Sequence, residues 1–176
     1  MVISTSVASA LTPMQSAFSN LDRFISSYVE GRENEPDASD SGKVILGNER
    51  LLTEYSHLIK GKRLGLVTNQ TGVDSAMVKT VDKLYNYNEA ELTAIYSPEH
   101  GLDGKTLAGK YVASYTDKTL NLPVYSLYGE TREPSKAMME NVDVMIFDMQ
   151  DIGSRTYTYM STLNYVMRAG KKYGKP

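Results

Sequence analysis

Hydrophobic strands that alternate with helical segments predict an α/β fold with a parallel, doubly wound sheet and helices on both faces. Runs such as Arg63–Thr68 and Val142–Phe147 are apolar almost throughout, as strands buried on both faces are. The segments between such runs carry apolar residues at helical spacing. Polar residues also follow each expected strand. In parallel sheets, ligand sites lie at this edge, where the strands end.

We expect the compact domain to occupy residues 44–176. Its expected strands are Arg63–Thr68, Leu92–Tyr96, Pro123–Leu127 and Val142–Phe147. Its expected helices are Glu49–Lys60 with Asn48 as N-cap, a helix from Asp74 or Ser75 to about Tyr87, a short helix from Pro134 to Glu140, and Tyr157–Lys172 ended by Gly174. The polar stretch Leu102–Leu122 is expected to be a loop, and loops this long are usually functional or mobile. Because a further strand should follow the last helix, we expect the chain to be a fragment of a longer protein.

Residues 1–43 are expected to lie outside this domain. Ala8-Ser9-Ala10 has the A-x-A form of a signal-peptidase site, which favours a clipped export signal and a periplasmic or secreted protein, with a cytoplasmic protein as the alternative. Apolar residues at helical spacing predict a short amphipathic helix over Ser16–Val29. Residues 30–43 are acidic and polar, which is typical of a flexible linker.

Composition excludes several classes of protein. A net charge of −2 gives no electrostatic case for nucleic-acid binding. The absence of cysteine excludes disulfides, thiolate metal sites and a cysteine nucleophile. No run approaches the ~20 apolar residues of a membrane-spanning helix. The chain has thirteen tyrosines and three phenylalanines. Because tyrosine packs through its ring and bonds through its hydroxyl, this balance favours a partly solvated surface for a polar ligand such as a sugar. The alternative is that the balance reflects chance variation in composition.

No cofactor is expected. Neither the G-x-G-x-x-G pattern of dinucleotide sites nor the G-x-x-x-x-G-K-[ST] pattern of P-loops occurs in the sequence. The loop Asn69–Gly72 contains one glycine, which is too few to bring the backbone close to a pyrophosphate. Nucleotide binding is therefore not expected.

Three loops carry polar side chains from the carboxyl ends of expected strands. They are Asn69–Gly72, Ser97–Gly101 and the stretch from Asp148 to Tyr159. Because the carboxyl ends of parallel strands meet at one edge of the sheet, these distant segments are expected to converge there.

Glu99 stands out because Pro98 and Gly101 fix the turn that carries it. It can serve as a general acid or base if burial raises its pKa, or it is an ordinary turn acid. Together with His100, Asp148 and Asp151 it could also hold a divalent cation, although the spacing matches no metal signature. Arg155 is either an ion-pair partner for these aspartates or a bidentate ligand for a substrate carboxylate.

The run from Lys62 to Pro176 resembles a known family. The blocks KGKRLGLVTNQTGV, SPEHGLDG, AGKYVASYTD, LPVYSLYG and FDMQDIGSRTYTYMSTL look like, in the same order, those of the exo-β-N-acetylmuramidase family, the NamZ-type glycoside hydrolases. The resemblance covers about two thirds of the chain, and residues 1–43 lie outside it.

This resemblance implies a Rossmann-like N-terminal domain that carries the catalytic glutamate, and a smaller C-terminal domain that packs on it and is missing from this sequence. It implies release of terminal N-acetylmuramic acid from the non-reducing end of peptidoglycan fragments, without nucleotide or metal. The family's glutamate lies in the P-E-H-G block, which corresponds to Glu99. The fragment alone is expected to be weakly active or inactive.

The remaining roles are hypotheses from the residues. Asp148 or Asp151 is the candidate second catalytic group or orients sugar hydroxyls, and His100 orients Glu99 or bonds the leaving group. Arg155 suits the lactyl carboxylate of muramic acid. The residues expected to line the sugar subsite are Asn69, Gln70, Tyr157 and Tyr159. Two alternatives stay open: a non-catalytic module that binds muropeptides, and a metal-dependent hydrolase.

Overall fold

The computed structural model describes residues 44–176, and residues 45–176 form one compact unit. The expected export signal, the helix Ser16–Val29 and the linker lie outside the described residues. No helix within residues 44–176 is long and apolar enough to cross a membrane.

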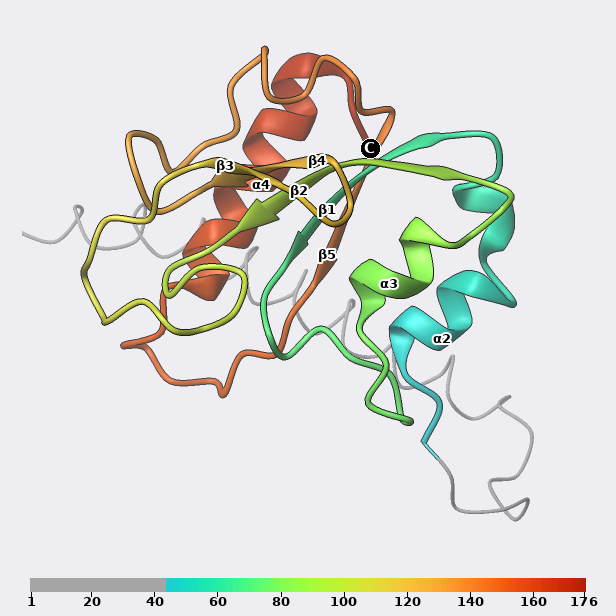
Figure 1. The fold of residues 1–176 in the computed structure, drawn as a ribbon, viewed down its shortest axis with the longest axis horizontal. Coiled ribbons are helices and arrows are strands. Elements are labelled where there is room, and N and C mark those ends of the chain that lie inside the picture. Colours follow the sequence, from blue (N-terminus) through green and yellow to red (C-terminus); the bar gives the residue numbers. More distant parts are fainter. Residues whose placement is uncertain (1–43) are drawn as a thin grey trace, which may run out of the picture. The chain divides into compact units, whose positions relative to one another are not determined.

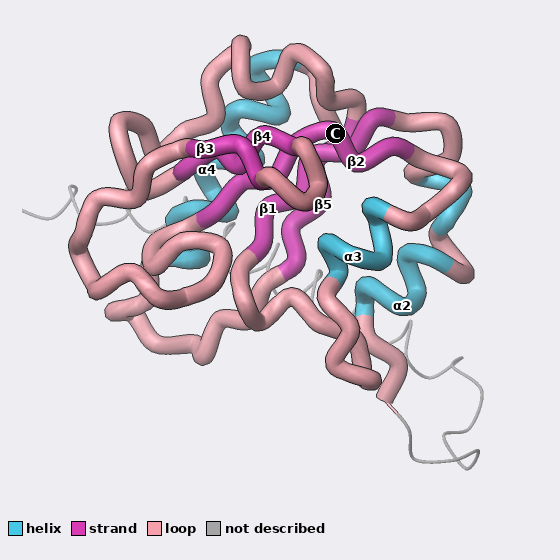
Figure 2. Tube along the Cα trace, in the orientation of Figure 1, coloured by secondary structure: helices cyan, strands magenta, loops and turns pink. Residues whose placement is uncertain are grey.

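A five-stranded sheet forms the centre of the unit (Figures 1 and 2). Its strands are β1 (Arg63–Thr68), β2 (Glu91–Ser97), β3 (Tyr115–Asp117), β4 (Leu122–Ser126) and β5 (Val144–Asp148). The strand order is β3-β4-β2-β1-β5, and all neighbours pair in parallel except β3 and β4. The predicted α/β fold is therefore confirmed, although the sheet, which was predicted to be parallel, has one antiparallel strand at its edge.

Helices cover both faces of the sheet. They are α2 (Gly47–Leu52), the 3-10 turn η1 (Ser56–Leu58), α3 (Thr80–Tyr85) and α4 (Tyr159–Tyr173). In Figure 1, α2 and α3 lie together on one side of the strands, while α4 lies behind them. The last helix ends as the sequence predicts, because Gly174 adopts a left-handed conformation with φ of 65° and its amide bonds back to Gly170.

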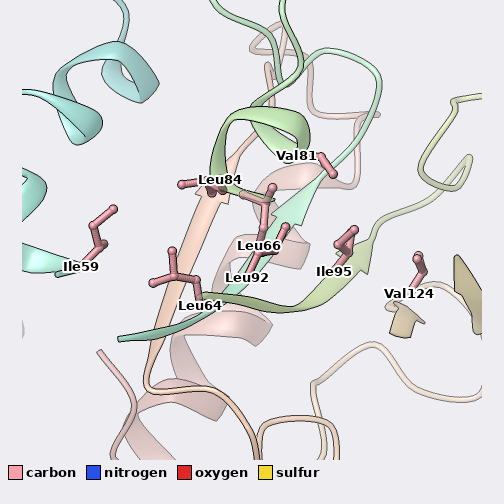
Figure 3. Packing of buried hydrophobic residues seen from close by; sticks show 8 residues of the cluster. All are labelled: Ile59, Leu64, Leu66, Val81, Leu84, Leu92, Ile95 and Val124. Atoms are coloured by element: carbon pink, nitrogen blue, oxygen red, sulfur yellow. The ribbon is translucent and has the colours of Figure 1, made fainter. Parts of the chain in front are cut away.

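Two hydrophobic cores follow from this layering. On the α3 face, Leu64, Leu66 and Ile95 of the central strands pack with Val81 and Leu84 of α3 (Figure 3). On the α4 face, the buried residues are Val67, Ala94, Tyr96, Leu127, Val142 and Val166. Successive residues of a strand point to opposite faces, so each central strand contributes to both cores.

The predicted helix Glu49–Lys60 is wrong in its start and its length. Its N-cap is Leu46, whereas Asn48 is buried and turns its side chain inward to Thr80 and Asp148. The helix ends at Leu52, because the Thr53 hydroxyl bonds to the Glu49 carbonyl at 3.0 Å and competes with the regular ladder.

Three other segments also differ from the prediction. The helix expected from Asp74 begins only at Thr80, since the Asp74 carboxylate accepts the amides of Ala76 and Val78 and holds a turn there. Residues 134–140 form turns rather than the expected helix. The expected loop Leu102–Leu122 contains the short strand β3.

Gly65 tests how tightly the sheet packs under α4. A methyl group at this position would lie 2.8 Å from Met145 Sδ and 2.9 Å from Tyr96 Cε2. We expect Gly65→Ala to lower the free energy of unfolding in urea by about 1–3 kcal/mol, the usual cost of overpacking a core. Gly47→Ala is the control, because nothing lies within 4 Å of the added methyl and no stability should be lost. A Gly65→Ala protein as stable as the parent would contradict the packing described for the α4 face.

Candidate active site

Loops from the carboxyl ends of the parallel strands converge, as the sequence predicts. The Gln150 amide after β5 donates to the Thr71 hydroxyl after β1 at 2.8 Å. The Thr158 hydroxyl at the start of α4 donates to Glu99 after β2, also at 2.8 Å. Segments 59 and 79 residues apart in the chain thus meet at one edge of the sheet.

Glu99 occupies the middle of this meeting point. It is 9% exposed, and both carboxylate oxygens accept hydrogen bonds. Oε1 accepts the Gly109 amide at 2.7 Å, and Oε2 accepts the Thr158 hydroxyl. The turn after it is tight, with His100 and Gly101 both in the left-handed region at φ of 72° and 77°. The loop is therefore shaped to hold one carboxylate in one orientation.

The ionisation of Glu99 reflects two opposing influences. Burial is the largest single one and acts to raise its pKa, but the raised pKa that a general acid would need is not what the structure shows. Hydrogen bonds from Gly109, Thr158 and Tyr128 act together in the other direction and hold the pKa below the ordinary value of a glutamate. The Glu99 carboxyl, with its pKa held below the ordinary value, is therefore ionised at neutral pH.

His100 shapes the loop beside Glu99. Its Nδ1 lies 2.8 Å from the Thr106 carbonyl oxygen, and its own carbonyl accepts the Thr106 amide at 3.1 Å. Because a carbonyl only accepts, Nδ1 carries the hydrogen in this contact. This arrangement is compatible with the predicted orienting role, which stays a prediction.

The two candidate aspartates have different surroundings. Asp148 Oδ2 accepts the Thr80 hydroxyl at 2.5 Å and the Asn48 amide at 3.3 Å, so this carboxylate connects β5 to the segments on the α3 face. Asp151 Oδ1 accepts the Gly153 amide at 2.7 Å, while its Oδ2 is buried without a hydrogen-bond partner within residues 44–176. Asp151 therefore has one bonded carboxylate oxygen and one that is buried and unpaired within residues 44–176.

Tyr159 connects Asp151, Asn69 and Glu99. Burial raises the pKa of the Tyr159 hydroxyl most strongly, the neighbouring Asn69 side chain opposes this, and the nearby charges of Glu99 and Asp151 raise the pKa further. The tyrosine therefore stays protonated and can donate. Asn69 is itself held by its Oδ1, which accepts the Thr71 amide at 2.9 Å and the Thr71 hydroxyl at 2.6 Å.

The other predicted sugar ligands have different surroundings. Tyr157 is 42% exposed and meets the buried Tyr159 ring edge to face, with 5.6 Å between centroids. Gln70 lies against Gly104, where an added methyl would come within 2.4 Å of the amide carbon of Gln70. Arg155 is exposed and makes no ion pair within residues 44–176. The ion-pair alternative for Arg155 is thus not what the structure shows.

Three groups at Glu99 are absent from the sequence-based site. Tyr128 could have been found, because it follows the carboxyl end of β4 just as the other site residues follow their strands. The Arg132 guanidinium also stacks over the Tyr128 ring, with 4.3 Å between Cζ and the ring centroid. Thr158 lies within the stretch singled out from the sequence but gives no separate signal. Gly109 contributes only its backbone amide, and no pattern of residues in the sequence predicts such a contact.

No group of three or more His, Asp or Glu side chains in the described part of the chain could hold a metal ion. Glu99, Asp148 and Asp151 each bond mainly to hydroxyls and backbone amides instead.

A mostly parallel α/β domain with a buried carboxylate at the carboxyl edge is the class of protein that this fold and site define. The chain belongs to the family described as exo-beta-N-acetylmuramidase NamZ, N-terminal, which it matches over residues 64–176. The resemblance drawn from the sequence blocks is confirmed.

Individual relatives agree with this assignment. The chain is 47% identical over 134 residues to the peptidoglycan beta-N-acetylmuramidase NamZ of Bacillus subtilis, covering 76% of this chain and 32% of that protein. It resembles the crystal structure of a DUF1343 family protein from Bacteroides fragilis with a TM-score of 0.66 and 41% identity, over 74% of this chain and 32% of that one. A second DUF1343 family protein from Bacteroides fragilis gives a TM-score of 0.60 and 33% identity, over 76% and 33%. The chain thus spans about a third of the length of each relative.

Thr158 provides a direct test of how the site controls Glu99. Replacing Thr158 by Val removes a hydrogen bond that favours the ionised carboxylate, so the pKa of Glu99 should rise. A titration of the Glu99 side-chain carboxyl by carbon-13 NMR measures this shift. Thr156→Val is the control, because that exposed hydroxyl bonds to Ser154 and not to Glu99. An unchanged Glu99 titration in Thr158→Val would show that this bond does not set its protonation.

Proposed function

We propose that this chain is the glutamate-bearing part of a glycoside hydrolase that releases terminal N-acetylmuramic acid from the non-reducing end of peptidoglycan fragments. The proposal concerns the longer protein, since the chain covers only 32% of its Bacillus subtilis relative. Family membership and the printed activity of that relative support it. The observation that carries it is the buried Glu99 at the point where the strand-end loops converge.

Glu99 acts as the general acid and base in this proposal. As the bond between the anomeric carbon and the glycosidic oxygen breaks, the Glu99 proton passes to the leaving oxygen. Glu99 must therefore be protonated in the complex although it is ionised without substrate. A substrate that displaces the Gly109 and Thr158 hydrogen bonds would leave burial as the dominant influence, and burial raises the pKa.

Asp151 is the better candidate for the second catalytic group. Its Oδ2 is buried and has no hydrogen-bond partner within residues 44–176, and it lies near Tyr159 together with Glu99. It would either activate a water molecule or attack the anomeric carbon. Asp148 would instead hold the end of β5 in place through Thr80.

Recognition of the muramic acid is assigned to the residues around Glu99. Asn69, Tyr157 and Tyr159 would bond and pack against the sugar, while His100 would orient Glu99. Arg155 would bind the lactyl carboxylate that distinguishes muramic acid from glucosamine, because a guanidinium holds a carboxylate in bidentate fashion. Its exposure and its lack of an ion pair within residues 44–176 support this role.

The proposed setting is outside the cytoplasm, where muropeptides and MurNAc-GlcNAc saccharides arise during turnover of the cell wall. The A-x-A sequence at Ala8-Ser9-Ala10 supports export. A C-terminal domain of the longer protein would pack on this one and complete the cleft.

Glu99→Gln tests the acid assignment in the full-length protein. The substitution keeps the shape of the side chain but removes the transferable proton, so the rate of release from a chromogenic aryl muramide should fall by roughly 10²- to 10⁴-fold. Glu91→Gln, at the exposed amino end of β2, is the matched control and should leave the rate unchanged.

Near-normal release by Glu99→Gln would overturn the assignment of Glu99 as the acid. Binding of the sugar without release by the parent protein would identify a sugar-binding module. Loss of activity on exhaustive chelation would favour the metal-dependent alternative.

Arg155→Lys tests recognition of the lactyl group. Lysine keeps the charge but loses the fork of donors, so kcat/KM for an aryl muramide should fall by about tenfold. The corresponding glucosaminide lacks the carboxylate and should be affected much less. Arg168→Lys, on the exposed side of α4, is the control. Equal losses of kcat/KM on both substrates would contradict the proposed role of Arg155 in binding the lactyl carboxylate.

A further inference from the structure

A second hollow lies beside the Glu99 site. It is a pocket of about 410 Å³ between α3, the loop after β2 and the β3–β4 hairpin. Asn69 and Gln70 from the loop after β1 line it. Asn69 lies near Tyr159, which in turn lies near Glu99, and Leu102 of the pocket follows Glu99 by three residues, so the pocket adjoins the candidate active site along the carboxyl edge of the sheet. Its volume falls within the ~300–1,000 Å³ of ordinary small-molecule pockets.

The pocket combines apolar and aromatic surface with polar groups. Val81, Leu102 and Leu120 contribute apolar surface that continues into the core of the α3 face. Tyr115 of β3 is 46% exposed and offers a ring and a hydroxyl. A half-exposed tyrosine beside apolar surface suits a ligand with one apolar face and polar edges.

The charges around the pocket nearly cancel. Lys79 and Lys105 face the three carboxylates of Asp82, Asp103 and Asp117. Such a lining has no strong field of one sign, so it does not favour a phosphate or another polyanion. It offers many donors and acceptors, to which Gln70 adds an amide, and this suits a neutral ligand rich in hydroxyl and amide groups.

We propose that this pocket is the subsite for the sugar on the far side of the scissile bond, a neutral N-acetylhexosamine. The inference rests on the proposed function, because Glu99 has to lie at the bond between the two sugars. The terminal muramic acid then occupies the space near Tyr159 and Arg155, and the second sugar passes Asn69 and Gln70 into the pocket. Tyr115 packs against the apolar face of that sugar, while Lys105 and Asp103 bond to its hydroxyls.

Two substrates of the full-length protein separate this inference from the proposed function. An aryl muramide has no second sugar, whereas the MurNAc-GlcNAc disaccharide has one. Tyr115→Ala and Lys105→Ala should each raise the KM for the disaccharide by about tenfold relative to the KM for the aryl muramide. Tyr115→Phe keeps the ring and should lose less than Tyr115→Ala. Lys118→Ala, exposed in the turn before β4 and outside the pocket, is the matched control.

The outcomes divide as follows. A parent protein that hydrolyses neither substrate overturns the proposed function. A parent that hydrolyses both, with Tyr115→Ala and Lys105→Ala affecting the two substrates equally, overturns the subsite and leaves the proposed function standing. Effects confined to a muropeptide that bears a stem peptide also overturn it, since the pocket would then bind peptide. Lys105→Ala changes an exposed loop residue, so its melting temperature should match that of the parent and its kinetics report on binding.

Discussion

The in-register pairing of the parallel strands is the constraint on which the site depends. In that register Thr68 lies beside Asp148, and Ser97 lies beside Ser126. Because neighbouring parallel strands end at the same edge, the loops that follow them begin side by side. A slip of one residue in β1 would turn Asn69 to the other face of the sheet and away from Tyr159. The packing of the two cores against α3 and α4 excludes such a slip, so the hydrophobic layers determine which polar groups meet.

Glu99 shows how tertiary structure can reverse the chemistry that burial alone implies. Burial favours the neutral acid, but donors from the long loop after β2, the start of α4 and the end of β4 favour the ionised form. Three separate segments must be in place to hold the charge. Whatever moves the Gly109 segment therefore also changes the proton affinity of Glu99. In the proposed mechanism, a substrate that displaces the Gly109 amide would also raise the pKa of Glu99, which would give the length of this loop a functional role.

The sequence predicts those features of this arrangement that follow from a local pattern of residues. It does not predict those that depend on contacts between distant segments. The bounds of β1 were predicted correctly, because Arg63–Thr68 is an apolar run between polar turns. Strand β3 was missed since Tyr115–Asp117 is short and lies at the edge of the sheet, where no burial imposes alternation. Asn48 was predicted to be an N-cap, but its side-chain amide donates to Asp148, a hundred residues later in the chain. Gly109 and Thr158 were missed as donors to Glu99 for the same reason, because only the folded chain brings them to it.

Strand alternation also bears on which aspartate works with Glu99. In β5, Val144 and Ile146 pack on the α3 face, whereas Met145 and Phe147 pack on the α4 face. Asp148 continues the first series, so its carboxylate turns to Thr80 on the α3 side. Thr158 and Tyr159 approach Glu99 from α4, on the other side. Asp151 lies beyond the strand, where alternation no longer fixes its direction, and its loop carries it to Tyr159. Within the proposed function, the direction of the strand therefore favours Asp151 over Asp148 as the candidate for the second catalytic group, while Asp148 bonds to Thr80 at the end of β5.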